Sequence, residues 1–74
     1  MPETPTTSIA IVLNGERYEL SAGTRIAALL ETLSMKPSRV AVEINREVVA
    51  KAKYAETVVR AGDQVEIINF VGGG

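Results

Sequence analysis

The chain has 74 residues, of which eight are Lys or Arg and nine are Asp or Glu, and its formal net charge is −1. A chain of this length forms at most one domain, and interspersed charges of both signs argue against a nucleic-acid-binding face or a polybasic membrane anchor. Because the sequence has no Cys and no His, it excludes disulfides, thiolate and imidazole metal sites, and Ser–His or Cys–His nucleophile pairs.

Residues 1–7 are polar, contain two prolines and lack the apolar core of a signal peptide. We expect this segment to be a disordered leader ahead of a domain at residues 8–71. The expected location of the protein is the cytoplasm.

The first structural signal is a β-hairpin around Asn14 and Gly15. Apolar residues alternate along residues 9–13, which is typical of a strand, and a return strand is expected at residues 16–20. An Asn-Gly pair favours a type I′ turn, because both positions need a positive φ. The two-residue turn predicts three pairs on one face: Leu13 with Glu16, Ile11 with Tyr18, and Ile9 with Leu20.

A short helix is expected after the hairpin. Thr24 is a plausible N-cap, and apolar residues then recur at helical spacing up to Leu33, which predicts a helix of about ten residues ending before Pro37. Such a short helix is marginal alone, so its leucine stripe must dock on the sheet. The stripe is Ile26, Leu29, Leu30 and Leu33.

A second hairpin is predicted at residues 40–50. Alternating apolar residues indicate a strand at 40–44, Asn45-Arg46 resembles a turn, and residues 47–50 form a short return strand.

The last part of the chain leads to its terminal glycines. Residues 51–59 are interpreted as a loop with a helical turn from which Tyr54 and Val58 pack inward. A tight turn at 61–63 precedes a final strand at 65–71, rich in β-branched residues, and then three glycines at 72–74 form a flexible tail.

This order of elements predicts an α+β domain of two layers, with four to five strands and one helix packed on one face of the sheet. The charged pairs Glu43/Glu47 and Glu16/Glu19 lack a pocket, so we interpret them as solvated surface charges rather than acid/base groups.

The pattern resembles the ubiquitin-like β-grasp fold and, more narrowly, is similar to the ThiS family of sulfur carriers in thiamine (thiazole) biosynthesis. The resemblance covers residues 9–74. Two features depart from the family pattern: the leader is long, and Tyr54 stands where Trp is common. The matching stretches are residues 12–16, 24–33, 42–45, 47–49, 61–67 and 71–74.

The resemblance implies that the first and last strands are parallel neighbours, so the sheet of four to five strands is a mixed sheet. It also implies a carrier rather than an enzyme, with three partners: a ThiF-type adenylyltransferase, a cysteine desulfurase and the thiazole synthase ThiG. No cofactor is expected on the chain itself, and the partner enzyme would consume the ATP.

Alternation along the last strand predicts a binding surface. Val65 and Ile67 should face the helix, while Ile68 and Phe70 face outward. If the first and last strands are neighbours, the outward residues form one exposed apolar patch, which is typical of a partner site. The predicted patch is Ala10, Val12, Ile68, Phe70 and Val71.

The tail chemistry is expected at Gly74. Its carboxylate would be adenylated and then converted to a thiocarboxylate, and a chain without Cys has no other place for sulfur. No phosphate-binding loop is present, so a separate enzyme must activate it. Gly72 and Gly73 have no Cβ, so the tail, about 10 Å long when extended, can thread a narrow channel.

Three alternatives stay open at this point. One is the small subunit of molybdopterin synthase, although residues 69–71 approach the glycines without proline. The others are a β-grasp interaction module without tail chemistry, and a ubiquitin-like modifier joined to lysines through Gly74.

Overall fold

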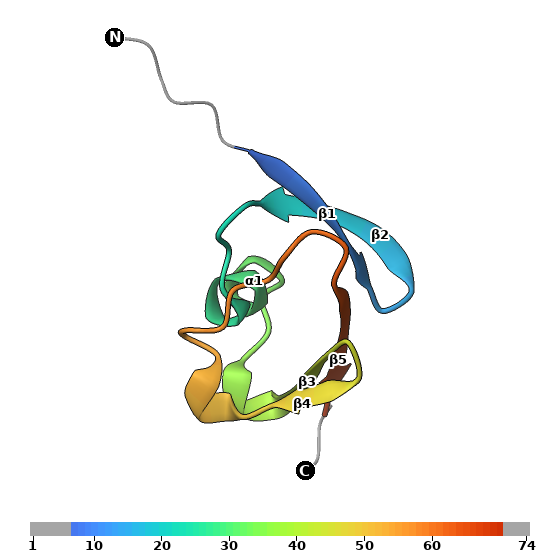
Figure 1. Cartoon of the computed structure of the whole chain (residues 1–74). Helices are drawn as coiled ribbons and strands as arrows, with labels where there is room; N and C mark the ends of the chain where they lie inside the picture. The colour runs from blue at the N-terminus through green and yellow to red at the C-terminus, as the bar shows by residue number, and fades with distance from the viewer. Residues whose placement is uncertain (1–6, 71–74) are drawn as a thin grey trace, which may run out of the picture.

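The computed structural model describes residues 7–70. Most of the expected leader, Val71 and the glycine tail at 72–74 lie outside the described residues. Within 7–70, the chain forms strands, one α-helix (α1) and two 3-10 helices (η1 and η2), shown in Figure 1. Their order is β1 (Ser8–Leu13), β2 (Glu16–Ser21), α1 (Ile26–Thr32), η1 (Pro37–Arg39), β3 (Val40–Ile44), β4 (Glu47–Val49), η2 (Lys51–Lys53) and β5 (Gln64–Asn69).

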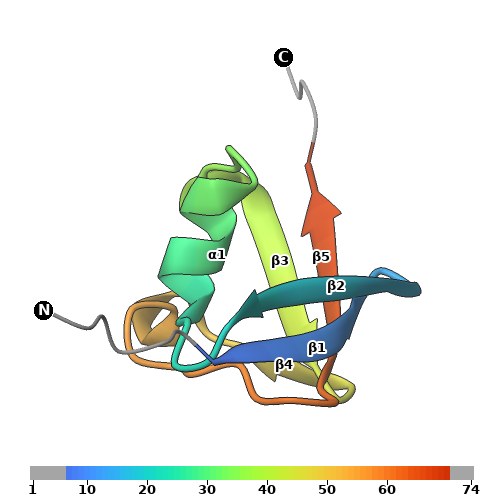
Figure 2. The same ribbon diagram turned by 90° about the horizontal axis from the view of Figure 1, so that it is seen from above.

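The five strands form one mixed sheet in the order β2-β1-β5-β3-β4. β1 and β5 are parallel, and the other neighbours are antiparallel. α1 lies against one face of this sheet, and the other face carries no helix of the described chain (Figure 2). The predicted two-layer α+β arrangement is therefore confirmed, with its parallel first and last strands.

The first hairpin has the predicted register. Asn14 and Gly15 adopt φ values of 50° and 84°, as a type I′ turn requires. The return strand is one residue longer than expected, because Ser21 pairs with Ser8. The three predicted pairs are confirmed: Leu13 with Glu16, Ile11 with Tyr18, and Ile9 with Leu20.

The predicted N-cap of the helix is wrong. The cap position is Arg25, which has no side-chain cap bond, and the Thr24 hydroxyl instead donates to the Ser21 carbonyl at 2.6 Å. The first helical N–H groups find tertiary acceptors: Ile26 donates to the Thr57 carbonyl and Ala27 to the Tyr54 carbonyl, each at 2.9 Å. Since these carbonyls satisfy groups that a capping side chain would otherwise bind, no local cap is needed.

The helix is also shorter than expected, with seven residues instead of about ten. It ends in a Schellman arrangement: Ser34 has a φ of 59°, and the Met35 N–H donates to the Leu30 carbonyl at 2.9 Å. Ser34 occupies a position where Gly is the usual residue, so the sequence carries no clear stop signal there.

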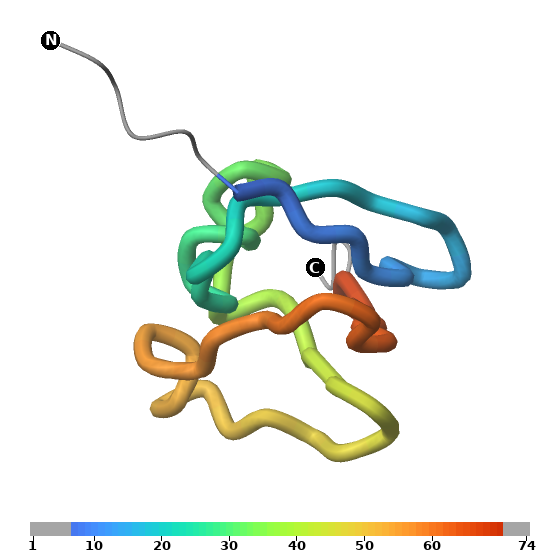
Figure 3. The backbone as a smooth tube through the Cα atoms, turned by 45° about the horizontal axis from the view of Figure 1, so that its top comes forward, coloured from blue at the N-terminus to red at the C-terminus, as the bar shows by residue number. Residues whose placement is uncertain are grey.

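The segment between β4 and β5 contains the expected helical turn, η2, and Tyr54 is buried as predicted. The prediction for Val58 is wrong: Val58 is half-buried, and its neighbour Val59 is 1% exposed in the core. The cause is tertiary pairing, because Val58 bridges Arg25. Figure 3 shows this segment, in orange, passing the start of α1 on its way to β5.

The core lies between α1 and the inner face of the sheet. No helix within residues 7–70 combines the length and apolar character needed to cross a membrane. The buried apolar residues are Ile11, Ile26, Leu29, Leu30, Val40, Val42, Tyr54, Val59, Val65 and Ile67.

Candidate functional site

β5 connects the core to the segment that contains the terminal glycines. It lies between β1 and β3, and all but its first residue, Val65 through Asn69, is in register with β3. Its pairing with β1 is much shorter, because only Gln64 and Val65 have strand partners there. The start of β5 is thus held on both edges by strands, while its end is held mainly by β3.

Two asparagine side chains extend this support. The Ile67 N–H donates to Asn14 Oδ1 at 2.8 Å, and Asn14 Nδ2 donates to the Ile67 carbonyl at 3.3 Å. On the other edge, the Gln64 N–H donates to Asn45 Oδ1 at 2.9 Å. The sequence indicated only turns at these asparagines. Their contacts with β5 join residues distant in the chain, which no local pattern reveals.

The two faces of β5 differ as predicted. Val65 and Ile67 are 0% and 6% exposed beneath α1, whereas Ile68 is 53% exposed on the outer face. Phe70 follows the strand and is 57% exposed, with its N–H donating to the Arg39 carbonyl at 2.7 Å. Two large apolar side chains therefore stand in solvent just before the glycine segment.

The pairing register of β1 with β5 separates the residues of the apolar patch that the sequence predicts. Val12, 38% exposed, lies opposite Gln64, four residues before Ile68 and roughly 13 Å away along the strand. The exposed Glu66 lies between them on the outer face of β5. Ala10 is half-buried and still further from Ile68, and Val71 lies outside the described residues. A single patch from Ala10 to Phe70 is therefore not formed, because β1 overlaps only the start of β5.

Ile68 has different neighbours from those expected. Its partner across the sheet is Ala41 of β3, and the next pair on the same face, Glu43 and Glu66, places two carboxylates opposite each other. Val48 of β4 is 75% exposed and lies opposite Glu43. The outer face near the tail is thus apolar at Ile68 and Phe70, and acidic further from it.

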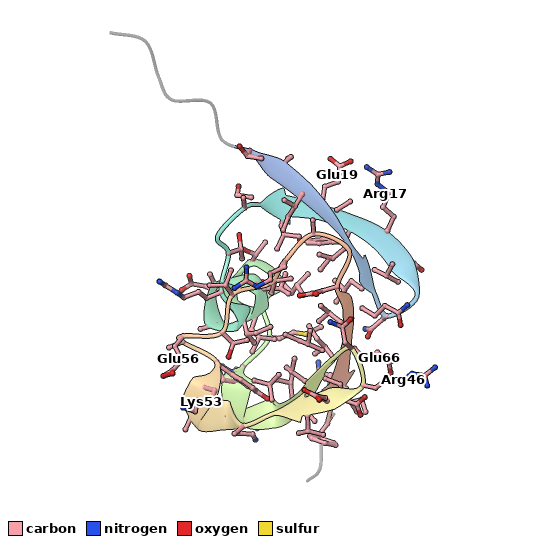
Figure 4. All side chains as sticks on the ribbon, in the orientation of Figure 1. Arg17, Glu19, Arg46, Lys53, Glu56 and Glu66 are labelled. Carbon is pink, nitrogen blue, oxygen red and sulfur yellow. The ribbon has the colours of Figure 1, made fainter. Side chains whose placement is uncertain are left out.

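The other charged pairs lie at the surface. Arg17 and Glu19 form an ion pair at 2.8 Å on β2, and Lys53 and Glu56 approach to 3.5 Å near η2 (Figure 4). Each of these side chains is more than half exposed, and among the described residues no group of three or more acidic residues could hold a metal ion. Both pairs are therefore solvent-exposed surface charges.

One open hollow of the described surface lies away from Phe70. Its volume is about 570 Å³, and it is bounded by β4 and by residues that precede β5. Lys53 and Arg60 line it together with Glu47 and Asp63, so its charges are mixed. Asp63 is engaged, accepting from the Arg60 N–H at 2.8 Å. This hollow meets the start of β5, not the end that leads to the tail.

Comparisons with known proteins agree with this geometry. The ThiS family model matches residues 11–74. The thiazole synthase of Magnetococcus marinus is 44% identical over 64 residues, which are 86% of this chain and 20% of the synthase. This chain therefore spans one fifth of that relative's length.

Two further comparisons cover relatives of similar size. The sulfur carrier protein ThiS of Escherichia coli is 30% identical over 64 residues, 86% of this chain and 97% of that protein. The crystal structure of the thiamine biosynthesis protein ThiS from Geobacter metallireducens superposes with a TM-score of 0.76 at 30% identity, covering 89% of this chain and 100% of that one.

Proposed function

The chain belongs to the ThiS family of sulfur carriers in thiamine biosynthesis and has their ubiquitin-like β-grasp fold, and on this premise we propose that the Gly74 carboxylate is its sulfur-bearing group. The family consists of carriers rather than catalysts. The observation that carries the proposal is the family match, which runs through residue 74 and includes a β5 that is bonded on both edges.

The proposed reaction activates a poor acyl donor. One oxygen of the Gly74 carboxylate attacks the α-phosphate of ATP, pyrophosphate leaves, and an acyl adenylate forms. A cysteine desulfurase holds the sulfur as a persulfide, and a thiol reductant releases it as sulfide while the thiol itself is oxidised to a disulfide. The sulfide then attacks the acyl carbon and displaces AMP. The product is a thiocarboxylate. The chain itself has no Cys that could carry the sulfur as a persulfide.

The proposed partners follow from what the chain lacks and from its relatives. It has no phosphate-binding loop, so a ThiF-type adenylyltransferase must bind the ATP. The thiazole synthase ThiG is the proposed acceptor of the sulfur. A segment similar to this chain within a thiazole synthase supports that choice, because joining two modules in one protein raises their effective concentration. We place the reaction in the cytoplasm.

The proposed docking surface is the apolar pair Ile68 and Phe70, with Val71 next in the chain. These side chains are exposed immediately before the glycines, so a partner that covers them also receives the tail. Gly72 and Gly73 would pass through a channel too narrow for side chains. Ala10 and Val12 lie apart and are assigned no role in this contact.

Intact mass spectrometry tests the proposal. After incubation with the adenylyltransferase, ATP, cysteine, desulfurase and a thiol reductant, the protein should gain the mass of one sulfur in exchange for one oxygen at Gly74. An unchanged mass would favour an interaction module, and isopeptide conjugates would favour a ubiquitin-like modifier. Rescue of a deletion strain by thiazole, and not by molybdenum cofactor, separates this carrier from the molybdopterin synthase subunit.

Gly73→Leu tests threading of the tail. The buried core of the described chain is formed by residues 11–67, so we expect an unchanged melting temperature, but the new side chain should block adenylation by closing the channel to Gly74. A variant lacking Gly73 and Gly74 is the negative control. Normal adenylation of Gly73→Leu would contradict the threaded tail while leaving the thiocarboxylate chemistry open to the mass measurement.

A further inference from the structure

We infer that Asn14 is a positioning residue for the tail: its side-chain amide fixes β5 at Ile67 and so sets the direction in which the chain leaves the sheet towards Gly74. This inference rests on the proposed function, since it concerns how Gly74 reaches a partner's active site. The type I′ turn requires a positive φ at this position, but it does not require the bonds that the Asn14 amide makes to β5.

The Asn14 side chain replaces a missing rung of the β1–β5 ladder. In the parallel pair, the Val12 N–H donates to the Asp63 carbonyl and the Asn14 N–H to the Val65 carbonyl, each at 2.9 Å. The next rung of a parallel ladder would join the Asn14 carbonyl to the Ile67 N–H. The turn begins at Asn14, with a φ of 50°, and Oδ1 of the side chain accepts that N–H instead, at 2.8 Å.

The same amide also binds the second polar group of Ile67. Nδ2 donates to the Ile67 carbonyl at 3.3 Å, so one side chain serves both backbone groups on this edge. An amide is suited to this task because it carries an acceptor and a donor side by side. Asp at neutral pH would accept from the N–H but would set a second acceptor against the carbonyl.

The position of this contact on β5 links it to the tail. Without Asn14, the β1 side of β5 would be bonded only as far as Val65, and with it the support reaches Ile67. Beyond Ile67, the bonds found among the described residues are on the β3 side, ending with Phe70 and the Arg39 carbonyl at 2.7 Å. Asn14 is thus the last group of the first hairpin to hold β5 before the tail.

The direction of the chain at Ile67 matters because the reacting group, the Gly74 carboxylate, lies further along the chain. In the proposed channel the tail would be extended, and each extended residue adds about 3.3–3.6 Å of reach, so a rotation of the strand end would be magnified at Gly74. A misplacement of about 1 Å at a reacting centre can cost roughly 100-fold in rate. A loosened strand end should therefore lower the turnover of adenylation more than the docking affinity.

Asn45 provides a matched control within the same molecule. It also begins a two-residue turn with a positive φ, 52°, and its N–H donates to the Gln64 carbonyl at 2.7 Å. Its Oδ1 accepts the Gln64 N–H at 2.9 Å, and its Nδ2 donates to Asp63 Oδ1 at 3.1 Å. The same device therefore acts at the start of β5, on the opposite edge and away from the tail.

The experiment compares Asn14→Gly with Asn45→Gly, because glycine keeps the positive φ and removes only the amide. Steady-state adenylation is measured with the ThiF-type enzyme, and stability by urea unfolding. We expect both variants to lose similar stability. Asn14→Gly should lower kcat by roughly tenfold or more with KM changed less than about twofold, and Asn45→Gly should change neither by more than about twofold.

Hydrogen exchange supplies a readout that needs no partner. The Ile67 N–H should exchange faster in Asn14→Gly than in the wild type, with lower backbone order at Phe70. If the wild type is not adenylated at all, the proposed function fails, while this measurement still reports whether Asn14 orders the end of β5. Unchanged order from Ile67 to Phe70 would overturn the inference on structural grounds.

Asn14→Asp keeps the inference testable if the glycine variant unfolds. At neutral pH it retains the acceptor and loses the donor, so its kcat should fall between those of the wild type and Asn14→Gly. Protonation of the new carboxyl at low pH restores a donor, and Ile67 N–H exchange, corrected for its intrinsic pH dependence, should slow again. A wild-type kcat in Asn14→Asp, or equal kcat in Asn14→Gly and Asn45→Gly, would overturn the positioning role.

Discussion

The two faces of β5 differ in burial: one packs in the core, and the other is the face on which the docking surface is proposed. Val65 and Ile67 are 0% and 6% exposed against the core, while Ile68 and Phe70 stand more than half exposed on the other side. Because side chains of a strand alternate between faces, the sequence can hold a strand in place and still present an apolar surface beside the tail. Substitutions on the buried side should therefore lower stability, whereas substitutions on the exposed side should lower partner affinity without unfolding the protein.

The largest effect on stability is expected in the core between α1 and the inner face of the sheet. Leu29→Ala removes a helix side chain that is 1% exposed and should lower the free energy of unfolding by about 2–5 kcal/mol. A domain of this size has only about 4–11 kcal/mol in total, so the loss is severe. Urea unfolding measures it, with Glu31→Ala on the exposed side of the same helix as the control. Equal midpoints for the two variants would contradict docking of the helix through Leu29.

Substitution at the exposed side should leave stability nearly unchanged and weaken partner binding. Phe70→Ser removes an exposed ring, so stability should change by less than about 0.5 kcal/mol, while affinity for the adenylyltransferase should fall roughly tenfold if the ring is an interface anchor. Isothermal titration with the purified enzyme measures this. Unchanged affinity would remove Phe70 from the proposed docking surface.

Val12→Ser sharpens the same comparison, because Val12 is exposed on the outer face but lies beside Gln64 rather than Ile68. We expect its affinity to match the wild type within about twofold, since it lies roughly 13 Å from Ile68. A loss as large as that of Phe70→Ser would show that the partner covers both parts of the face.

The smallest effect is expected at the surface ion pair of β2. Arg17 and Glu19 are 73% and 58% exposed, so solvent screens their attraction and Arg17→Ala should cost at most about 0.5 kcal/mol. The difference from wild type should shrink further in high salt. A loss comparable to that of Leu29→Ala would mean that the outer face contributes to folding far more than its exposure indicates.

The sequence by itself determined the features that depend on neighbouring residues. The register around Asn14-Gly15 follows from a two-residue turn, and the alternation of Val65 and Ile67 with Ile68 follows from the strand period. The resemblance in motifs, covering most of the chain, indicated the β-grasp fold and the parallel central strands. These predictions were confirmed because local geometry and hydrophobic pattern specify the same arrangement.

Only the tertiary structure decided how distant segments meet. The helix begins at Ile26 because the Thr57 and Tyr54 carbonyls satisfy its first N–H groups, and Val59 rather than Val58 enters the core because Val58 bridges Arg25. The short overlap of β1 with β5 divided the expected patch. Asn14 and Ile67 lie 53 positions apart in the chain, so only packing of the whole sheet could reveal that a turn residue holds the strand that leads to the tail.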